Sequence, residues 1–527
     1  MSAGSDFLQL RVSSAPPKGL TTWLVDAVRA AVADGRLPAG TRLPATRVLA
    51  ADLRISRGVV VEAYQRLVDE GLAQARTGAG TVITALLAAP PAVTRSLPPA
   101  APTAPSAGPA TAGPNAPTAP TAVAATAGPT VAGGSGRVST PAGFRLPLGP
   151  AAGIEFDLSP GRPDLAAFPR AAWLRAERAV LATLTSADLG YGDPRGTLAL
   201  RRQLAAWLAR TRGIRADPDD IVVVAGVAQA LALVAIVLAR SAPAAGGTVR
   251  GPDVAVEDPG SRGARDQLAS WGLRPCPVPV DDEGLRVDAL APSGARTVLL
   301  TPAHQFPTGV VLGPTRRREL IAWAGATDGL ILEDDYDAEH RYDRAPVAAV
   351  QASAPDHVVY MGSTSKTLAP GMRLGWMIPP AALREDLIAV KHSADLGNPA
   401  LSQLVLAELL ATGEYERHLR RVRVRQRHRR DALLAALREH LPDARVEGVA
   451  AGLHLLITFP GDVPDEVLAQ EAAAVGVRVH PLSWHRMVPG PPGLVLGYAA
   501  HPPNRLEEAA RRMGNRLAAV VRGRPAR

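Results

Sequence analysis

Cysteine and lysine are both scarce in this chain of 527 residues, and each scarcity limits what the protein can be. Cys276 is the only cysteine, which excludes an internal disulfide framework and a thiolate-rich metal site. We therefore expect no metal centre and a reducing compartment. Lys18, Lys366 and Lys391 are the only lysines, and every other basic side chain except histidine is arginine. A lysine that is kept points to chemistry that a guanidinium cannot perform.

The chain also lacks a recognisable export signal, because "MSAGSDFLQLRVSS" has no basic start followed by an apolar run. We expect a cytoplasmic protein. One uncharged run, residues 221–239, is about long enough to cross a bilayer. Its β-branched start, Gly226, Gln229 and its Ala/Leu-rich remainder favour a buried strand followed by a buried helix, so no membrane association is expected.

Length and composition divide the chain into three parts, since a single core rarely exceeds ~250–300 residues. Residues 1–85 are charge-rich with only a mild positive excess, and we expect them to form a small domain. Residues 86–152 are rich in Pro, Ala, Thr and Gly and contain no acidic residue, which predicts a disordered linker. Residues 153–527 alternate strand-like apolar runs with helical patterns, which indicates an α/β domain whose parallel or mixed sheet lies between helices.

The first part predicts a helix-turn-helix followed by a wing. Residues 46–53 and 56–72 are expected to form two helices after a longer first helix, and Ser56 opens the last one as its N-cap. The stretch "AQARTGAGTVI" (73–83) predicts two short strands around a glycine turn. A small helical interaction domain with solvated arginines is the alternative.

This part closely resembles the GntR-type winged helix through "GRLPAGTRLPATRVLA", "SRGVVVEAY" and "GAGT". The resemblance implies operator DNA as a partner, with Arg57 in the first turn of the recognition helix and Gly80 allowing close approach of the wing backbone. Gly58 and Val59 depart from the usual pattern, and Val59 lacks the hydroxyl of the common threonine. The residues implied to lie at the DNA are Arg47, Ser56, Arg57, Tyr64, Arg76 and Gly80.

A second basic run, "RHLRRVRVRQRHRR" (417–430), lies in the last part of the chain. Such a run is usually a solvated or dimer-facing helix, and an auxiliary contact with DNA is the alternative.

Lys366 lies in "GSTSKTLAPGMRLGW" (362–376), which is not a P-loop, because Ser365 stands where a P-loop needs glycine. Lysine is the side chain whose primary amine forms a Schiff base with the aldehyde of pyridoxal 5'-phosphate (PLP). Lys366 is therefore the candidate Schiff-base lysine.

PLP chemistry also needs a carboxylate at the ring nitrogen, an aromatic hydroxyl at the ring oxygen and a phosphate cup. Asp334 and Tyr336 are two apart and so share one side of an extended chain. Candidates for the phosphate cup are the amides of Val227 and Ala228 at a helix start, and Ser363, Ser365 and Arg373 beside the lysine. His304, a tempting general base, is expected to be a hydrogen-bonded structural histidine.

Residues from about 155 onward resemble a fold-type-I PLP-dependent aminotransferase. The shared stretches are "YGDPRGTLALRRQLAAWLARTRGI", "VEDPGSRGAR", "TPAHQFPTGVVL", "EDDYDAEHRY" and "STSKTLAPGMRLGW". Together with the GntR-type head, the whole chain resembles the MocR/GabR regulators. The resemblance implies Lys366, Asp334, Tyr336, Ser363, Ser365 and Arg373 as PLP-binding residues, with Tyr191 reaching the phosphate from the other subunit of a homodimer.

Three departures weaken the match to a working aminotransferase. Ser261 stands where the family usually has a tyrosine stacked on the cofactor ring, a contact worth roughly 0.5–1.5 kcal/mol. Val227 and Ala228 replace a small residue and a glutamine. Leu494 is expected about where true aminotransferases carry the arginine that binds a substrate carboxylate.

We therefore predict a PLP-dependent transcriptional regulator that binds DNA through its winged helix and senses a small amine, amino acid or B6 vitamer. Weak or partial transamination is compatible with this function. Two alternatives remain: an active aminotransferase with an accessory DNA-binding head, and a repressor whose second domain has lost PLP.

Overall fold

The computed structural model describes residues 153–241, 251–342, 347–448 and 451–521, and in the N-terminal part residues 19–34, 36–70, 72–76 and 80–84 with a few earlier positions. The described residues all fall within one unit of the chain, made of residues 1–87 and 148–527. The predicted linker, 86–152, lies outside the described residues.

The N-terminal part contains helices α1 (Leu20–Ala33), α2 (Thr46–Asp52) and α3 (Arg57–Asp69), followed by the antiparallel hairpin of β1 (Ala73–Arg76) and β2 (Gly80–Ile83). Ser56 caps α3, and its side chain accepts a hydrogen bond from the amide of Val59 at 3.4 Å. Val60 and Leu67, seven residues apart on α3, are fully buried in the core of this part. The predicted winged helix-turn-helix is confirmed.

The larger part is built on an eight-stranded sheet with the order β4-β11-β10-β9-β8-β5-β6-β7. Strands β10, β9, β8, β5 and β6 are parallel, whereas β11 is antiparallel to both β10 and β4, and β7 is antiparallel to β6. The strands are β4 (Val222–Val224), β5 (Asp253–Asp258), β6 (Arg274–Asp281), β7 (Gly284–Leu285), β8 (Thr297–Leu300), β9 (Leu330–Asp335), β10 (Val358–Ser363) and β11 (Gly375–Ile378).

Helices cover both faces of this sheet, because alternate residues of each buried strand point to opposite sides. Val223 and Trp376 pack with residues of α4, α5 and α11, whereas Val222 and Met377 pack with residues of α6, α7 and α10. The helices are α4 (Arg170–Thr183), α5 (Leu198–Arg212), α6 (Val227–Ser241), α7 (Arg262–Ser270), α8 (Leu290–Ser293), α9 (Pro314–Thr327), α10 (Ala381–Asp395) and α11 (Ala400–Ala411).

The uncharged run 221–239 forms β4 and most of α6, as the sequence predicts. Within the described residues, no helix has both the length and the apolar character that a membrane span requires.

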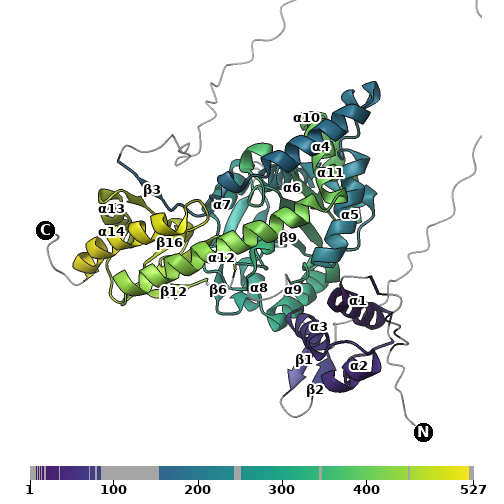
Figure 1. The fold of residues 1–527 in the computed structure, drawn as a ribbon, viewed down its shortest axis with the longest axis horizontal. Helices are drawn as coiled ribbons and strands as arrows, with labels where there is room; N and C mark the ends of the chain where they lie inside the picture. The colour runs from purple at the N-terminus through teal and green to yellow at the C-terminus, as the bar shows by residue number, and fades with distance from the viewer. Residues whose placement is uncertain are drawn as a thin grey trace, which may run out of the picture. The chain divides into compact units, whose positions relative to one another are not determined.

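The C-terminal part is a four-stranded antiparallel sheet with the order β12-β13-β16-β15, and a short parallel pair joins β14 to β3. Its strands are β3 (Phe156–Asp157), β12 (Arg445–Glu447), β13 (His454–Thr458), β14 (Val477–Arg478), β15 (His480–Pro481) and β16 (Gly493–Gly497). Figure 1 shows α12 (Glu414–His440) extending from the helices around the large sheet to this C-terminal sheet, where α13 (Asp465–Ala474) and α14 (Pro503–Val521) also lie.

Candidate functional site

Two neighbouring parallel strands bring the predicted PLP-binding residues to one edge of the large sheet. Asp334 lies near the end of β9 and is paired in register with Met361 of β10. Strand β10 ends at Ser363, three residues before Lys366. Because parallel strands present their carboxyl ends at the same edge, Asp334 and Lys366 meet there.

The side chain of Lys366 is held in a largely buried position. Its Nζ donates a hydrogen bond to the carbonyl oxygen of Gly161 at 2.5 Å. Burial lowers the pKa of Lys366, and the nearby carboxylates of Asp334 and Asp337 oppose that shift. A lowered pKa increases the fraction of neutral amine, which is the form that attacks a carbonyl carbon.

One carboxyl oxygen of Asp334 lacks a hydrogen-bond donor among the described residues. Burial raises the pKa of Asp334 to about 7, and the neighbouring acids Asp335 and Asp337 add to the shift, while Lys366 opposes it. Its Oδ1 is buried and has no hydrogen-bond partner among the residues that the structure describes. A protonated ring nitrogen would satisfy this oxygen, so the site fits the pyridine ring of PLP.

Tyr336 follows Asp334 and remains a neutral hydroxyl. Its hydroxyl donates to the backbone carbonyl of His304 at 3.1 Å and lies 3.1 Å from the Nδ1 of the same residue. Burial raises the pKa of Tyr336 well above its ordinary value, with the negative charge of Asp337 adding to the effect. The hydroxyl is therefore protonated at physiological pH.

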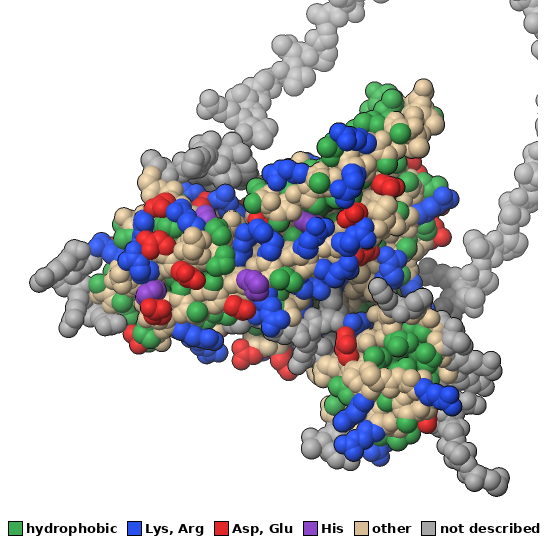
Figure 2. Space-filling model, viewed as in Figure 1, with side chains coloured by type: hydrophobic (Ala, Val, Ile, Leu, Met, Phe, Trp, Pro, Cys, Tyr) green, Lys and Arg blue, Asp and Glu red, His purple; other side chains and the backbone are tan. Residues whose placement is uncertain are grey.

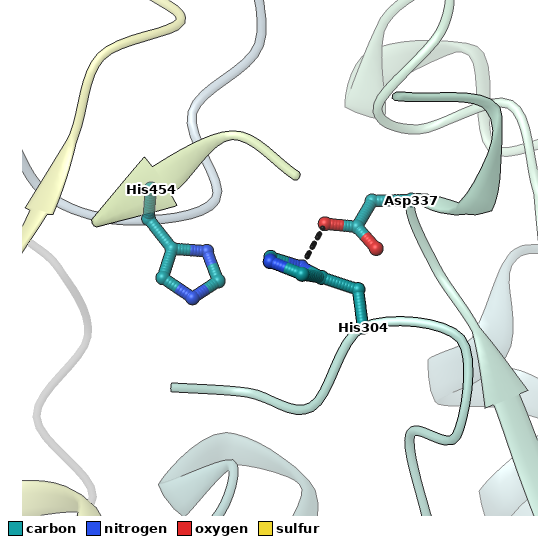
Figure 3. Close-up of side chains that lie close together, drawn as sticks. All are labelled: His304, Asp337 and His454. Atoms are coloured by element: carbon teal, nitrogen blue, oxygen red, sulfur yellow. Dashed lines mark hydrogen bonds and ion pairs between the residues drawn. The ribbon is translucent and has the colours of Figure 1, made fainter. Parts of the chain in front are cut away.

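His304 belongs to a buried cluster with Asp337 and His454 (Figure 3). Its Nδ1 lies 2.9 Å from Oδ2 of Asp337, and His454 Nε2 donates to the carbonyl of Pro307 at 3.2 Å. Figure 3 shows the His304 ring between the other two side chains. The three possible ligand atoms lie within 4.8 Å of one another, but the bond between His304 and Asp337 already satisfies two of them. His304 is thus a hydrogen-bonded histidine, as expected, and its buried Nε2 has no partner in the described part of the chain.

The start of α6 and the loop after β10, which carry the residues predicted for the phosphate cup, lie next to each other. Arg373 donates a hydrogen bond to the carbonyl of Ala225, directly before α6. Gly226 has φ +88°, and a Cβ at this position would lie 3.4 Å from Nη1 of Arg373. Glycine therefore permits both the backbone turn and the approach of the guanidinium. The amides of the first helical turn begin at Val227 and Ala228.

The serines of the cup are linked to each other. Ser363 is buried at the end of β10, and its Oγ accepts a hydrogen bond from the amide of Ser365 at 3.3 Å. This bond fixes the turn that leads into Lys366.

Tyr191 is not part of this cluster within its own chain. Its side chain is 92% exposed and lines a surface groove of about 1450 Å³ together with residues 395–404. A place for Tyr191 at the phosphate therefore requires a second subunit.

Two of the departures from the aminotransferase pattern have structural explanations. Ser261 caps α7, since its Oγ accepts a hydrogen bond from the amide of Ala264 at 3.3 Å. Leu494 is fully buried in the C-terminal core, where an aliphatic side chain packs well. Strand alternation turns Val495 to the opposite side, where it packs with Phe306.

The predicted DNA-binding residues are only partly confirmed as surface residues. Arg47, Ser56 and Arg57 are exposed at the starts of α2 and α3. Gly80 begins β2 with φ +83°, and Arg76 ends β1. The placement of Tyr64 is a correction: it is 4% exposed, and its hydroxyl donates to the carbonyl of Pro44 at 2.9 Å. Tyr64 holds the segment before α2 and does not reach the surface.

Two family models match the chain. "Bacterial regulatory proteins, gntR family" matches residues 20–83, and "Aminotransferase class I and II" matches residues 154–513. The probable rhizopine catabolism regulatory protein MocR of Rhizobium meliloti is 31% identical over 92% of this chain and 91% of its own length. The chain belongs to the MocR-type family of transcriptional regulators.

Other MocR-type proteins and aminotransferases are similar to this chain. The HTH-type pyridoxine biosynthesis transcriptional regulator PdxR of Corynebacterium glutamicum is 30% identical over 94% of this chain and 95% of its own length. Among solved structures, the α-aminoadipate aminotransferase LysN of Thermus thermophilus, complexed with N-(5'-phosphopyridoxyl)-L-leucine, has a TM-score of 0.63. It is 27% identical and covers 70% of this chain and 94% of its own.

Sequence reasoning missed several residues of this MocR-type site. Gly161 and His454 come from distant segments, and nothing local marks them as neighbours of Lys366 or His304. Glu257 is also buried near Asp334, and burial raises its pKa to about 7. Asp337 was detectable, because it follows Tyr336 in the acidic stretch that ends β9.

Proposed function

We propose that this regulator holds PLP on Lys366 and senses a small amine, amino acid or B6 vitamer, and that its winged helix binds operator DNA in response. The observation that carries the proposal is that Lys366 lies close to Asp334, whose Oδ1 is buried and unpartnered among the described residues. DNA-binding regulators act where the chromosome lies, so we also propose a cytoplasmic location.

When bound, PLP supplies an aldehyde that condenses with a primary amine. Burial favours the neutral amine of Lys366, and Asp334 would pair with the ring nitrogen. Tyr336 would donate its hydroxyl proton to the ring oxygen. The phosphate would be held by the cup residues described above: Val227, Ala228, Ser363, Ser365 and Arg373.

An effector amine would act by taking the place of Lys366. The released Nζ is then free to donate to the carbonyl of Gly161, a bond that the structure already contains. Effector binding would thereby shift the population of arrangements of the segment around Gly161, and DNA affinity would change with it.

Efficient transamination is not part of this proposal. Val495, the residue of β16 on the side of Phe306, is aliphatic and cannot bind a carboxylate. Arg265 is buried, and its guanidinium donates to the carbonyls of His485 and Trp484. Its hydrogen bonds are thus directed to the backbone and not to a ligand.

The site would be completed by a homodimer. Leu174, Leu181 and Leu189 are exposed apolar residues in the same segment as the exposed Tyr191. Burial of these side chains against a second chain would remove apolar area from water. Tyr191 would then reach the phosphate of the other subunit.

The cofactor proposal is tested by mixing the purified protein with PLP, reducing it with borohydride and mapping the modified peptide by mass. We expect the adduct on Lys366 alone. Lys391 is the internal control. It is 0% exposed and its amine donates hydrogen bonds to Asp395 and Asn398, so it should not react with PLP.

A Lys366→Arg variant keeps the positive charge but has no primary amine, so it should give neither the visible absorbance band nor the adduct. An unchanged band in this variant, or an adduct on Lys391, would overturn the assignment. Turnover of an amino donor with a keto acid would instead favour the active aminotransferase.

A further inference from the structure

A basic groove of about 1040 Å³ lies between the start of α4 and the first half of α12. Its wall carries six arginines against a single acidic residue, Glu414. The arginines of this basic groove are Arg170, Arg175, Arg417, Arg420, Arg421 and Arg425.

The arginines on α12 form a row along one face of the helix. Arg417, Arg421 and Arg425 are four residues apart, so successive positions rise by ~6 Å along the axis. Their side chains are 49%, 66% and 50% exposed. Figure 2 shows Lys and Arg side chains gathered over the part of α12 next to α4. A row of separate cations along a helix can contact successive phosphates of a nucleic acid backbone.

Two carboxylates neutralise part of this charge, and one of them is Asp164, which pairs with Arg425 at 2.9 Å and with Arg429 at 2.9 Å. Glu414 is shared among Arg175 at 3.2 Å, Arg417 at 3.0 Å and Arg421 at 4.0 Å. Among the described residues, Arg420 has no acidic partner. Exposed pairs of this kind contribute little to stability, so a requirement of the fold does not explain the arginine row.

We propose that the basic groove binds the phosphate backbone of double-stranded DNA, as a second contact besides the winged helix. Charge complementarity carries this inference, because six arginines against Glu414 and the Asp164 partner of Arg425 leave an excess of four positive charges, which would release counterions from a nucleic acid. The contact would involve phosphates and no base edges, so it would strengthen binding to DNA of any sequence. This inference extends the proposed function and rests on it, because the groove can contact DNA only if the protein binds DNA.

The test measures the affinity of the full-length protein for a random-sequence DNA duplex of several helical turns as a function of salt concentration. The variant combines Arg417→Gln, Arg420→Gln and Arg421→Gln. The control combines Arg286→Gln, Arg445→Gln and Arg511→Gln, which removes the same charge from exposed arginines outside the groove.

We expect the slope of log affinity against log salt to fall by about 2–3 in the groove variant and to stay unchanged in the control, since each lost phosphate contact removes ~0.9. Equal slopes in the two variants would overturn the proposal. A change of molecular mass in light scattering for the groove variant alone would also overturn it, and would assign this face to a subunit interface.

Repeating the salt titration in an Arg57→Ala background separates this inference from the proposed function. The groove effect should persist there, because it does not depend on the recognition helix. If the groove variant leaves the salt slope unchanged while Arg57→Ala lowers DNA affinity, only the proposed groove contact is contradicted. If the groove variant lowers the slope while Arg57→Ala leaves DNA affinity unchanged, only the proposed role of the winged helix is contradicted.

Discussion

Lys366 and Gly161 are joined across 205 residues of sequence by a hydrogen bond from Nζ to the carbonyl oxygen, 2.5 Å long. Gly161 has φ +79°, a backbone conformation that side chains disfavour. A Cβ at this position would lie 3.2 Å from Nζ of Lys366. Glycine thus allows the segment to approach the lysine closely.

Gly161→Ala is expected to weaken PLP binding, because the added methyl crowds the amine and the backbone conformation is strained. The matched control is Gly272→Ala, which has φ +85° and no neighbouring atom within 4 Å of the added Cβ. Both variants should lose about 1 kcal/mol of stability. Only Gly161→Ala should also lower PLP affinity in an absorbance titration, and equal affinities would contradict the proposed coupling.

Asp334→Asn is expected to have opposite effects on the protein without PLP and on PLP binding. The folded-state pKa of Asp334 is raised from 3.8 to about 7, so the folded state loses stability as the pH rises from about 4 to about 7. Asparagine does not ionise, so at pH 8 the variant without PLP should be more stable than the wild type by roughly 1–4 kcal/mol. PLP affinity should fall, because the ring nitrogen loses its carboxylate.

Urea unfolding at pH 4 and pH 8 checks the first effect, and absorbance titration checks the second. The stability difference should shrink towards pH 4, where the wild-type carboxyl is protonated. A variant that is less stable at pH 8 and binds PLP normally would contradict the position of Asp334 at the ring nitrogen.

Ser261→Ala is expected to lower stability without changing PLP affinity. The serine oxygen accepts from the amide of Ala264, and loss of such a cap costs about 1 kcal/mol. Thr197→Ala is the matched control, because Thr197 caps α5 with a 3.4 Å bond from Leu200. If Ser261→Ala changed the PLP dissociation constant more than Thr197→Ala, Ser261 would act on the cofactor and not only as a cap.

Local patterns predicted much of the site, because its main residues lie near strand ends within short motifs. The pairing of β9 with β10 follows from two buried apolar runs, and it brings Asp334 to Lys366. Register was harder: strand alternation makes Leu494 and Val495 face opposite sides, and the sequence alone did not decide which of them packs with Phe306. Gly161 and His454 were out of reach, because no local pattern encodes contacts between distant segments.

Tyr64 shows the limit of motif matching in the N-terminal part. Its place in the motif suggested DNA, but its hydroxyl donates to the carbonyl of Pro44 inside the protein. Tyr64→Phe should therefore destabilise this part by about 1 kcal/mol, and faster hydrogen exchange in α2 and α3 would show it. If Tyr64→Phe lowered DNA affinity while hydrogen exchange in α2 and α3 stayed unchanged, Tyr64 would have to contact DNA directly.

Arg57 is the residue whose replacement should separate DNA recognition from the rest of the protein. It is exposed in the first turn of α3, directly after the cap Ser56, where base edges and phosphates are within reach. Arg57→Ala should lower affinity for DNA selected by the wild-type protein roughly tenfold to a hundredfold, since such contacts contribute ~1–3 kcal/mol. The control is Arg36→Ala, an exposed arginine of the same part that pairs with Asp34. Gel-shift titration measures both variants, and their PLP absorbance should stay unchanged. Equal affinities for Arg57→Ala and Arg36→Ala would show that α3 is not the recognition helix.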